Sequence, residues 1–231
     1  NLFEPAIRIT HNDGNPSLEL EYQNHTIQKI DDNTAEIIIK LKDPQYPVFF
    51  NLHYKTFYKE NVIESWTEIE HNEKKAVMLY NYASSALHLD ADQYWLTQFY
   101  SDVVEEVRME ESQLTRGIKV IDSKLGVRTN MFASPSFFLS LNSKSGENTG
   151  EVIAGTIAWS GNFKYTFDID NNNELRIISG INEFASEYNL EPGKTFKTPV
   201  FIYTFSNQGK GQASRNLHAW ARKYGLKDGE K

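Results

Sequence analysis

Pairs of acidic residues are the part of this sequence that could most directly do chemistry. Hydrolysis of a glycosidic bond requires two carboxylates, one on each side of the bond that breaks. Three pairs supply that residue type: Glu68 with Glu70, Glu105 with Glu106, and Glu110 with Glu111. The first pair alternates along a predicted strand face, and the other two lie in the segment VVEEVRMEES, which we interpret as a charged loop. Because a solvated face or loop explains all three pairs, we assign no catalytic residue.

Other residue types that carry chemistry are absent or unsuitably spaced. The chain has no cysteine, which excludes disulfides, zinc–thiolate sites and thiol nucleophiles. Its six histidines show no HxH or HxxxH spacing, so we predict no metal site. No nucleophile elbow, Walker loop or dinucleotide fingerprint is present, and we predict no cofactor. These residues indicate a binding or structural domain.

Two tryptophans beside predicted turns are candidates for contact with a sugar. An aromatic ring can stack on the C–H face of a sugar while neighbouring amides and carboxylates reach its hydroxyl groups. Trp95 lies in YWLTQFYSD, and Trp159 begins the turn WSGN that contains Asn162. Trp95, Trp159 and Asn162 are therefore the candidate substrate-binding residues. The alternative, that each ring packs between sheets, stays open for both tryptophans and is favoured for Trp66.

Composition and charge limit the classes of partner. The chain has 231 residues, 39% of them hydrophobic, and a net charge of −7. Because no basic stripe could neutralise phosphates, nucleic acids and anionic membrane surfaces are not expected partners. No apolar run approaches the ~20 residues that a membrane-spanning helix needs. The composition predicts a soluble globular protein.

Most of the chain up to residue 205 alternates apolar and polar residues, which is the pattern of half-buried strands. In residues 163–169 the alternation predicts Phe163, Tyr165, Phe167 and Ile169 between two sheets, with Lys164, Thr166 and Asp168 on a solvated face. We expect strands over 17–22, 34–42, 48–57, 61–70, 75–90, 93–102, 116–122, 136–142, 150–159, 163–170, 174–179 and 195–205. Many short strands without intervening helices predict one all-β, antiparallel two-sheet sandwich.

The C-terminal part changes to helical spacing. From Gly211 onward, apolar residues recur at positions that share one helix face: Ala213, Leu217, Trp220, Ala221 and Tyr224. Gly225 is a suitable C-cap residue. We expect this amphipathic helix to present Leu217, Trp220 and Tyr224 as an exposed apolar patch that favours an interface or self-association.

The order of motifs resembles the N-terminal domain of glycoside hydrolase family 36, which includes the bacterial α-galactosidases. The similar segments include EPAIRI near the start, LHYKTFYKENVIESWTEIEHN at 52–72, YWLTQFYSD at 94–102, GEVIAGTIAWSGNF at 150–163 and SGINEFASEYNLEPGKTFKTPVFIYTFS within 179–222. They occur in the same order over essentially the whole chain. No single motif is decisive, but the ordered set is specific.

The resemblance implies a fold and a division of labour. It implies that residues 1–210 form a large β-supersandwich, trimmed at its N-terminus, and that residues 211–231 form a helix leading toward a (β/α)₈ barrel beyond Lys231. In the family, the barrel carries two aspartates of a retaining mechanism, and its nucleophile lies in a Lys-Trp-Asp context. The four tryptophans here are followed by Thr, Leu, Ser and Ala, so that motif is absent. The chain is therefore expected to be inactive alone.

The resemblance also implies partners and a compartment. The expected partners are the catalytic barrel, α-galactoside oligosaccharides and further copies of the same enzyme in a homo-oligomer. The expected location is the bacterial cytoplasm or periplasm. Two alternatives remain: an independent carbohydrate-binding module that uses Trp95 or Trp159, and an unrelated self-contained enzyme or transport component.

Overall fold

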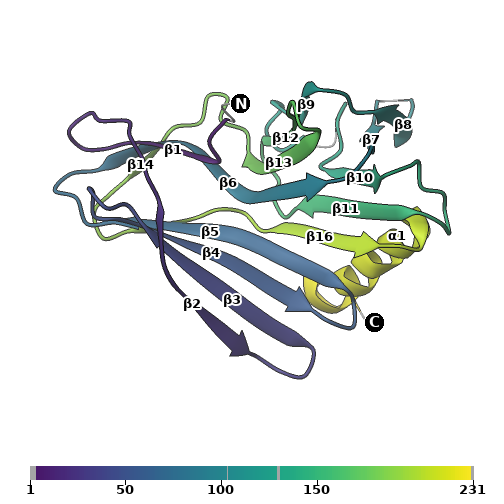
Figure 1. Ribbon diagram of the computed structural model, residues 1–231, viewed down its shortest axis with the longest axis horizontal. Helices are drawn as coiled ribbons and strands as arrows, with labels where there is room; N and C mark the ends of the chain where they lie inside the picture. Colours follow the sequence, from purple (N-terminus) through teal and green to yellow (C-terminus); the bar gives the residue numbers. More distant parts are fainter. Residues whose placement is uncertain (1–3, 103, 129–130, 230–231) are drawn as a thin grey trace.

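Sixteen strands in two antiparallel sheets, followed by one helical segment, make up the described part of the chain (Figure 1). The computed structural model describes residues 4–102, 104–128 and 131–229. The all-β class, the two antiparallel sheets and the C-terminal helix expected from the sequence are confirmed.

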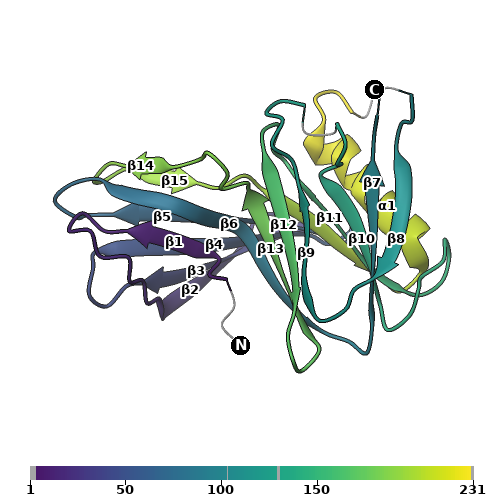
Figure 2. The ribbon, with the colours of Figure 1, turned by 90° about the horizontal axis from the view of Figure 1, so that it is seen from above.

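The larger sheet runs across the whole length of the molecule (Figure 2). Its strand order is β2 (Glu21–Lys29), β3 (Thr34–Lys42), β4 (Val48–Phe57), β5 (Val62–His71), β16 (Phe201–Ser206), β11 (Glu151–Ile157), β10 (Ser136–Leu141), β7 (Tyr94–Tyr100) and β8 (Arg108–Gln113). The short β15 (Thr195–Lys197) also pairs with β5.

The smaller sheet covers one face of the larger one. Its order is β1 (Ile7–Thr10), β6 (Val77–Asp90), β13 (Glu174–Ile181), β12 (Phe163–Ile169) and β9 (Gly117–Asp122), and β14 (Tyr188–Leu190) pairs with β6. The two sheets diverge toward β2 and β3, which lie farthest from the smaller sheet in Figure 1.

Two main apolar clusters lie between the sheets. The first contains the predicted inner face of β12, since Phe163, Tyr165, Phe167 and Ile169 are all at most 3% exposed. The second is built around Phe50, Ile69 and Leu79. The expected solvated face of β12 is partly wrong, because Thr166 is only 3% exposed. It lies between Val120 of β9 and Ile178 of β13, whose side chains cover it.

Several strands differ from the sequence prediction. The segment that contains Glu110 and Glu111 is strand β8 rather than a loop, and β1 and β14 were not expected. β2 spans Glu21–Lys29 instead of 17–22. A bulge between Tyr22 and Asn24 interrupts its alternation, and both of its faces are exposed, so its sequence carries little burial signal.

The helix α1 (Gly209–Trp220) begins two residues earlier than expected. Its first amide groups are capped by a neighbouring loop, because Gly209, Lys210 and Gly211 donate to the carbonyl oxygens of Gly150, Gly146 and Glu147. The helix continues as a π-helical segment, η1 (Ala221–Gly225), and Gly225 does not adopt the left-handed conformation expected of a C-cap. Neither helical segment of the described chain has the length and hydropathy of a transmembrane helix.

Candidate functional site

One carboxylate of each acidic pair seen in the sequence has neighbouring cations or hydrogen-bond donors. Glu105 accepts a hydrogen bond from Arg108 at 2.6 Å, with both side chains exposed. Glu111 on β8 accepts hydrogen bonds from Lys210 and from Thr97 Oγ1. Burial acts to raise the pKa of Glu111, but the contact with Lys210 outweighs it and lowers that pKa. Glu111 is therefore a charged residue whose ion pair with Lys210 connects β8 to α1, and it is not suited to act as a proton donor.

Glu68 belongs to a polar cluster on the face of the larger sheet that is turned away from the smaller one. The His53 ring stacks on Trp66 with ring centroids 4.6 Å apart, and its Nδ1 lies 2.8 Å from Glu36 Oε1. The Glu68 Oε2 atom lies 3.4 Å from His53 Nε2, and Lys197 lies over the Trp66 ring. Each charged group has a partner within the sheet. Trp66 is only 8% exposed, but His53 and Lys197 cover its ring on this outer face, so the expectation that it packs between the sheets is wrong.

Trp95 lies on the same face, at the other end of the sheet. Its indole N–H donates to Gln93 Oε1 at 3.3 Å, and the Lys144 ammonium group lies 4.5 Å from the ring centroid. A cation held at this distance contributes a cation–π attraction. A sugar that stacked on the same side of the ring would have to displace Lys144.

Trp159 is the more accessible tryptophan, with 40% of its surface exposed. Its indole N–H donates to the Asn162 carbonyl oxygen at 3.2 Å, and the ring lies so close to Gly161 that a Cβ there would be 2.6 Å from Nε1. The Asn162 side-chain oxygen accepts a hydrogen bond from the Gly126 amide at 2.7 Å. Asn162 thus holds the loop that follows β9, and one of its polar atoms is already used.

The structure does not bring the two tryptophans together. Trp95 lies opposite Ser140, which lies opposite Val152 at the start of β11. Trp159 comes seven residues after Val152. At about 3.3 Å per strand residue, the backbone positions of the two tryptophans are roughly 20 Å apart along the strand direction. They could therefore contribute to one site only with a long ligand.

The predicted interface residues of the helix lie against their own sheet. Leu217 and Trp220 are half-buried and pack against Phe57, Val62 and Ile202. Tyr224 lies over Phe57 with ring centroids 4.5 Å apart, and its hydroxyl accepts a hydrogen bond from the Asn33 side chain at 2.9 Å. Tyr224 keeps 38% of its surface exposed. The expected exposed patch is therefore wrong for Leu217 and Trp220, and a role of the three residues in an interface stays a prediction.

Sequence reasoning did not find a buried ionic pair next to β1. His11 Nδ1 lies 2.6 Å from Glu73 Oε1, and both side chains are almost fully buried. His11 Nε2 lies 2.7 Å from the Ser17 carbonyl oxygen, so both ring nitrogens face oxygen atoms. The His11 ring also stacks on Tyr46. Within the described residues, no group of three or more His, Cys, Asp or Glu side chains could hold a metal ion.

Comparison with known proteins places this architecture in a family. The profile described as the glycosyl hydrolase family 36 N-terminal domain matches residues 1–191. Among curated relatives, α-galactosidase Mel36A of Lactobacillus acidophilus is 24% identical over 229 residues, covering 93% of this chain and 31% of that protein. α-Galactosidase AgaA of Geobacillus stearothermophilus is 25% identical over 231 residues, with the same coverage of 93% and 31%.

Solved structures show the same fold. The crystal structure of α-galactosidase AgaB from Geobacillus stearothermophilus superposes with a TM-score of 0.91 at 23% identity, covering 96% of this chain and 32% of that one. A variant of AgaA from the same organism, solved in complex with stachyose, gives a TM-score of 0.90 at 23% identity, covering 96% and 33%. The chain spans about a third of the length of the relatives and structures that it matches.

Proposed function

The chain belongs to the glycosyl hydrolase family 36 N-terminal domains, and from this membership we propose that it is the supporting domain of an α-galactosidase. The main support for the proposal is the family match over residues 1–191. In addition, the curated relatives are α-galactosidases about three times as long as this chain. The hydrolytic step, cleavage of a terminal α-D-galactosyl residue with retention, then belongs to a (β/α)₈ barrel outside this chain.

The described carboxylates support a non-catalytic role. A retaining glycosidase needs a nucleophile and a proton donor whose carboxyl groups are about 5 Å apart across the substrate. In this chain Glu111 is tied to Lys210, and Glu68 lies in a cluster with His53 and Lys197. Neither Glu111 nor Glu68 lines the apolar cavity of about 340 Å³ between the two sheets. The domain would therefore support the barrel while doing no chemistry itself.

Substrate class and assembly follow from the relatives as proposals. Variants of AgaA have been solved with stachyose and with raffinose, so oligosaccharides that end in α-galactose are the proposed substrates of the longer enzyme. Tyr224, with Leu217 and Trp220 beside it, is the proposed contact of this domain with the barrel or with a second subunit of a homo-oligomer. The partly exposed Tyr224 ring at the end of the helix supports that position.

The coding sequence that follows Lys231 tests the proposal. We expect it to encode alternating strands and helices of a barrel, with a Lys-Trp-Asp motif at the end of one strand. A stop codon directly after Lys231, or a continuation without a barrel, would refute the role of a supporting domain in an α-galactosidase.

The second candidate function is an independent carbohydrate-binding module, which the exposure of Trp159 favours. If the domain only supports a barrel, calorimetric titration of the chain with galactose, melibiose and raffinose is expected to give no saturable heat. Saturable heat that Trp159→Ala abolishes and Trp95→Ala preserves would establish the module instead. If only Trp95→Ala abolished the saturable heat, the sugar site would lie at β7 instead.

A further inference from the structure

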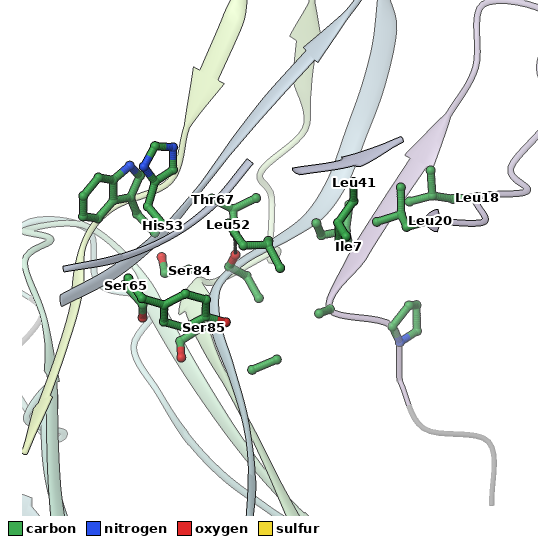
Figure 3. A pocket seen from close by; sticks show the side chains of 16 residues that line it. Ile7, Leu18, Leu20, Leu41, Leu52, His53, Ser65, Thr67, Ser84 and Ser85 are labelled. Carbon is green, nitrogen blue, oxygen red and sulfur yellow. Dashed lines mark hydrogen bonds between the residues drawn. The ribbon is translucent and has the colours of Figure 1, made fainter. Parts of the chain in front are cut away.

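A cavity of about 340 Å³ lies between the two sheets, near the point where they diverge. Figure 3 shows it from close by, with side chains from β1, β3, β4, β5 and β6 around it. Its walls are mostly aliphatic: Ile7, Leu18, Leu20, Leu41 and Leu52 line it, together with Pro5, Ala6, Ala83 and Ala86. The volume lies within the range of ligand pockets, which is about 300–1,000 Å³.

The cavity exists because small side chains line one wall. The central residues of β6 are Ala83, Ser84, Ser85 and Ala86, which extend only a short distance toward the larger sheet. A bulge in the pairing of β6 with β13 lies next to them, between Ser179 and Gly180. Leu18 and Leu20 belong to the segment that crosses from β1 to β2, and they cover the cavity from the opposite side.

Three serine hydroxyl groups lining the cavity have no hydrogen-bond partner in the described part of the chain. They belong to Ser65, Ser84 and Ser85, which are 2%, 2% and 6% exposed. By contrast, Thr67 beside them donates to the Ala83 carbonyl oxygen at 3.1 Å. Buried polar groups in native proteins are nearly always hydrogen-bonded, so three unpartnered hydroxyls around one cavity point to a group that bonds to them when it is filled.

The distribution of polarity defines the chemistry of that group. In Figure 3 the three serines lie close together at one end, and Leu18, Leu20, Leu41 and Ile7 lie at the other. No Asp, Glu, Lys or Arg side chain is among the lining residues, and the His53 imidazole that lines the cavity is already paired with Glu36, so a charged ligand would lack a partner. Burial raises the pKa of Tyr54, whose side chain also lines the cavity.

We propose that this cavity binds a small neutral molecule with an aliphatic body and one hydroxyl or carbonyl group. The polar group would bond to Ser65, Ser84 and Ser85, and the aliphatic body would contact the leucines. A galactoside fits poorly, because most of its hydroxyl groups would face aliphatic side chains without partners. The proposal therefore does not depend on the α-galactosidase assignment, and either can fail alone.

The test is a titration of the 231-residue chain with 1-heptanol, followed by calorimetry and by the methyl NMR signals of the leucines. We expect saturable binding, the largest shifts at Leu41 and Leu52, and no binding of galactose. Ser85→Ala is expected to weaken binding about fivefold to tenfold, since one hydrogen bond to the ligand is lost. The matched control is Ser179→Ala, because Ser179 is equally buried and unpartnered but does not line the cavity.

A second variant keeps the proposal testable if the serine variants fold poorly. Leu20→Trp, at the half-buried cover of the cavity, is expected to fill the space and abolish 1-heptanol binding without lowering the melting temperature. Absence of saturable binding to the unmodified chain would overturn the proposal. Equal affinities of the unmodified chain, Ser85→Ala and Leu20→Trp would overturn it too, because binding would then lie elsewhere.

Discussion

Replacement of Glu73 by alanine is expected to lower the free energy of unfolding by about 3–5 kcal/mol, the typical cost of removing one partner of a buried ion pair. The substitution leaves the buried His11 ring without its carboxylate partner. It also removes the carboxylate that accepts hydrogen bonds from the backbone and side-chain amides of Asn12. His11 Nδ1 and the two Asn12 amides therefore each lose their contact with Glu73. Chemical denaturation monitored by tryptophan fluorescence measures the effect.

The matched control for this prediction is Glu70→Ala. Glu70 is a half-buried glutamate on β5, close to Glu73 in the sequence, and we expect its loss to change stability by no more than about 0.5 kcal/mol. Equal effects of the two substitutions would mean that the His11–Glu73 pair contributes nothing specific.

The same pair contributes to the dependence of stability on pH. Burial acts to raise the pKa of Glu73, but hydrogen bonds from His11 and Asn12 outweigh it and lower that pKa below its ordinary value of 4.5. A carboxyl group whose pKa is lower in the folded state stabilises the fold fully above its unfolded pKa and loses that contribution as pH falls through the folded value. The unmodified chain is therefore expected to lose stability below pH 4.5 more steeply than Glu73→Ala.

Replacement of Phe137 by alanine is the second large effect that we expect, at about 3–5 kcal/mol of unfolding free energy. Phe137 on β10 is 1% exposed and lies at the centre of the first apolar cluster. Its ring centroid is 5.0 Å from that of Phe167 and 5.4 Å from that of Tyr165, both across the gap between the sheets. The truncation leaves a cavity that β10 and β12 cannot close without moving their backbones.

Phe205→Ala provides the control for that measurement. Phe205 on β16 is also an aromatic strand residue, but it is 44% exposed, so we expect it to cost less than about 1 kcal/mol. If Phe137→Ala were as mild as Phe205→Ala, the inner face of β10 would not be the contact that holds the two sheets together.

The sequence predicted the strands that bury one face, because those strands alternate apolar and polar residues. The inner face of β12 is the clearest case, and the wrong assignment of Thr166 arose because its covering neighbours lie on other strands. β8 was missed because charged residues of an edge strand look like those of a loop. The bounds of β2 were predicted wrongly because this strand has no regular apolar face.

The candidate sites were harder to predict, because they depend on contacts between distant residues. His11 and Glu73 are 62 positions apart, and nothing in the spacing of either residue indicates the pair. Ser65 belongs to β5 whereas Ser84 and Ser85 belong to β6, and only the packing of the sheets brings their hydroxyl groups to one cavity. Conversely, the sequence singled out Trp95 by residue type, but could not reveal that Lys144 lies over its ring.

Hydrolysis of p-nitrophenyl α-galactoside tests the central claim most directly, when the purified 231-residue chain is assayed beside the longer polypeptide that we propose contains it. The claim that this domain supports catalysis but performs none predicts turnover by the longer polypeptide and none by the chain alone. Robust hydrolysis by the chain itself, or none by the longer polypeptide, would contradict it.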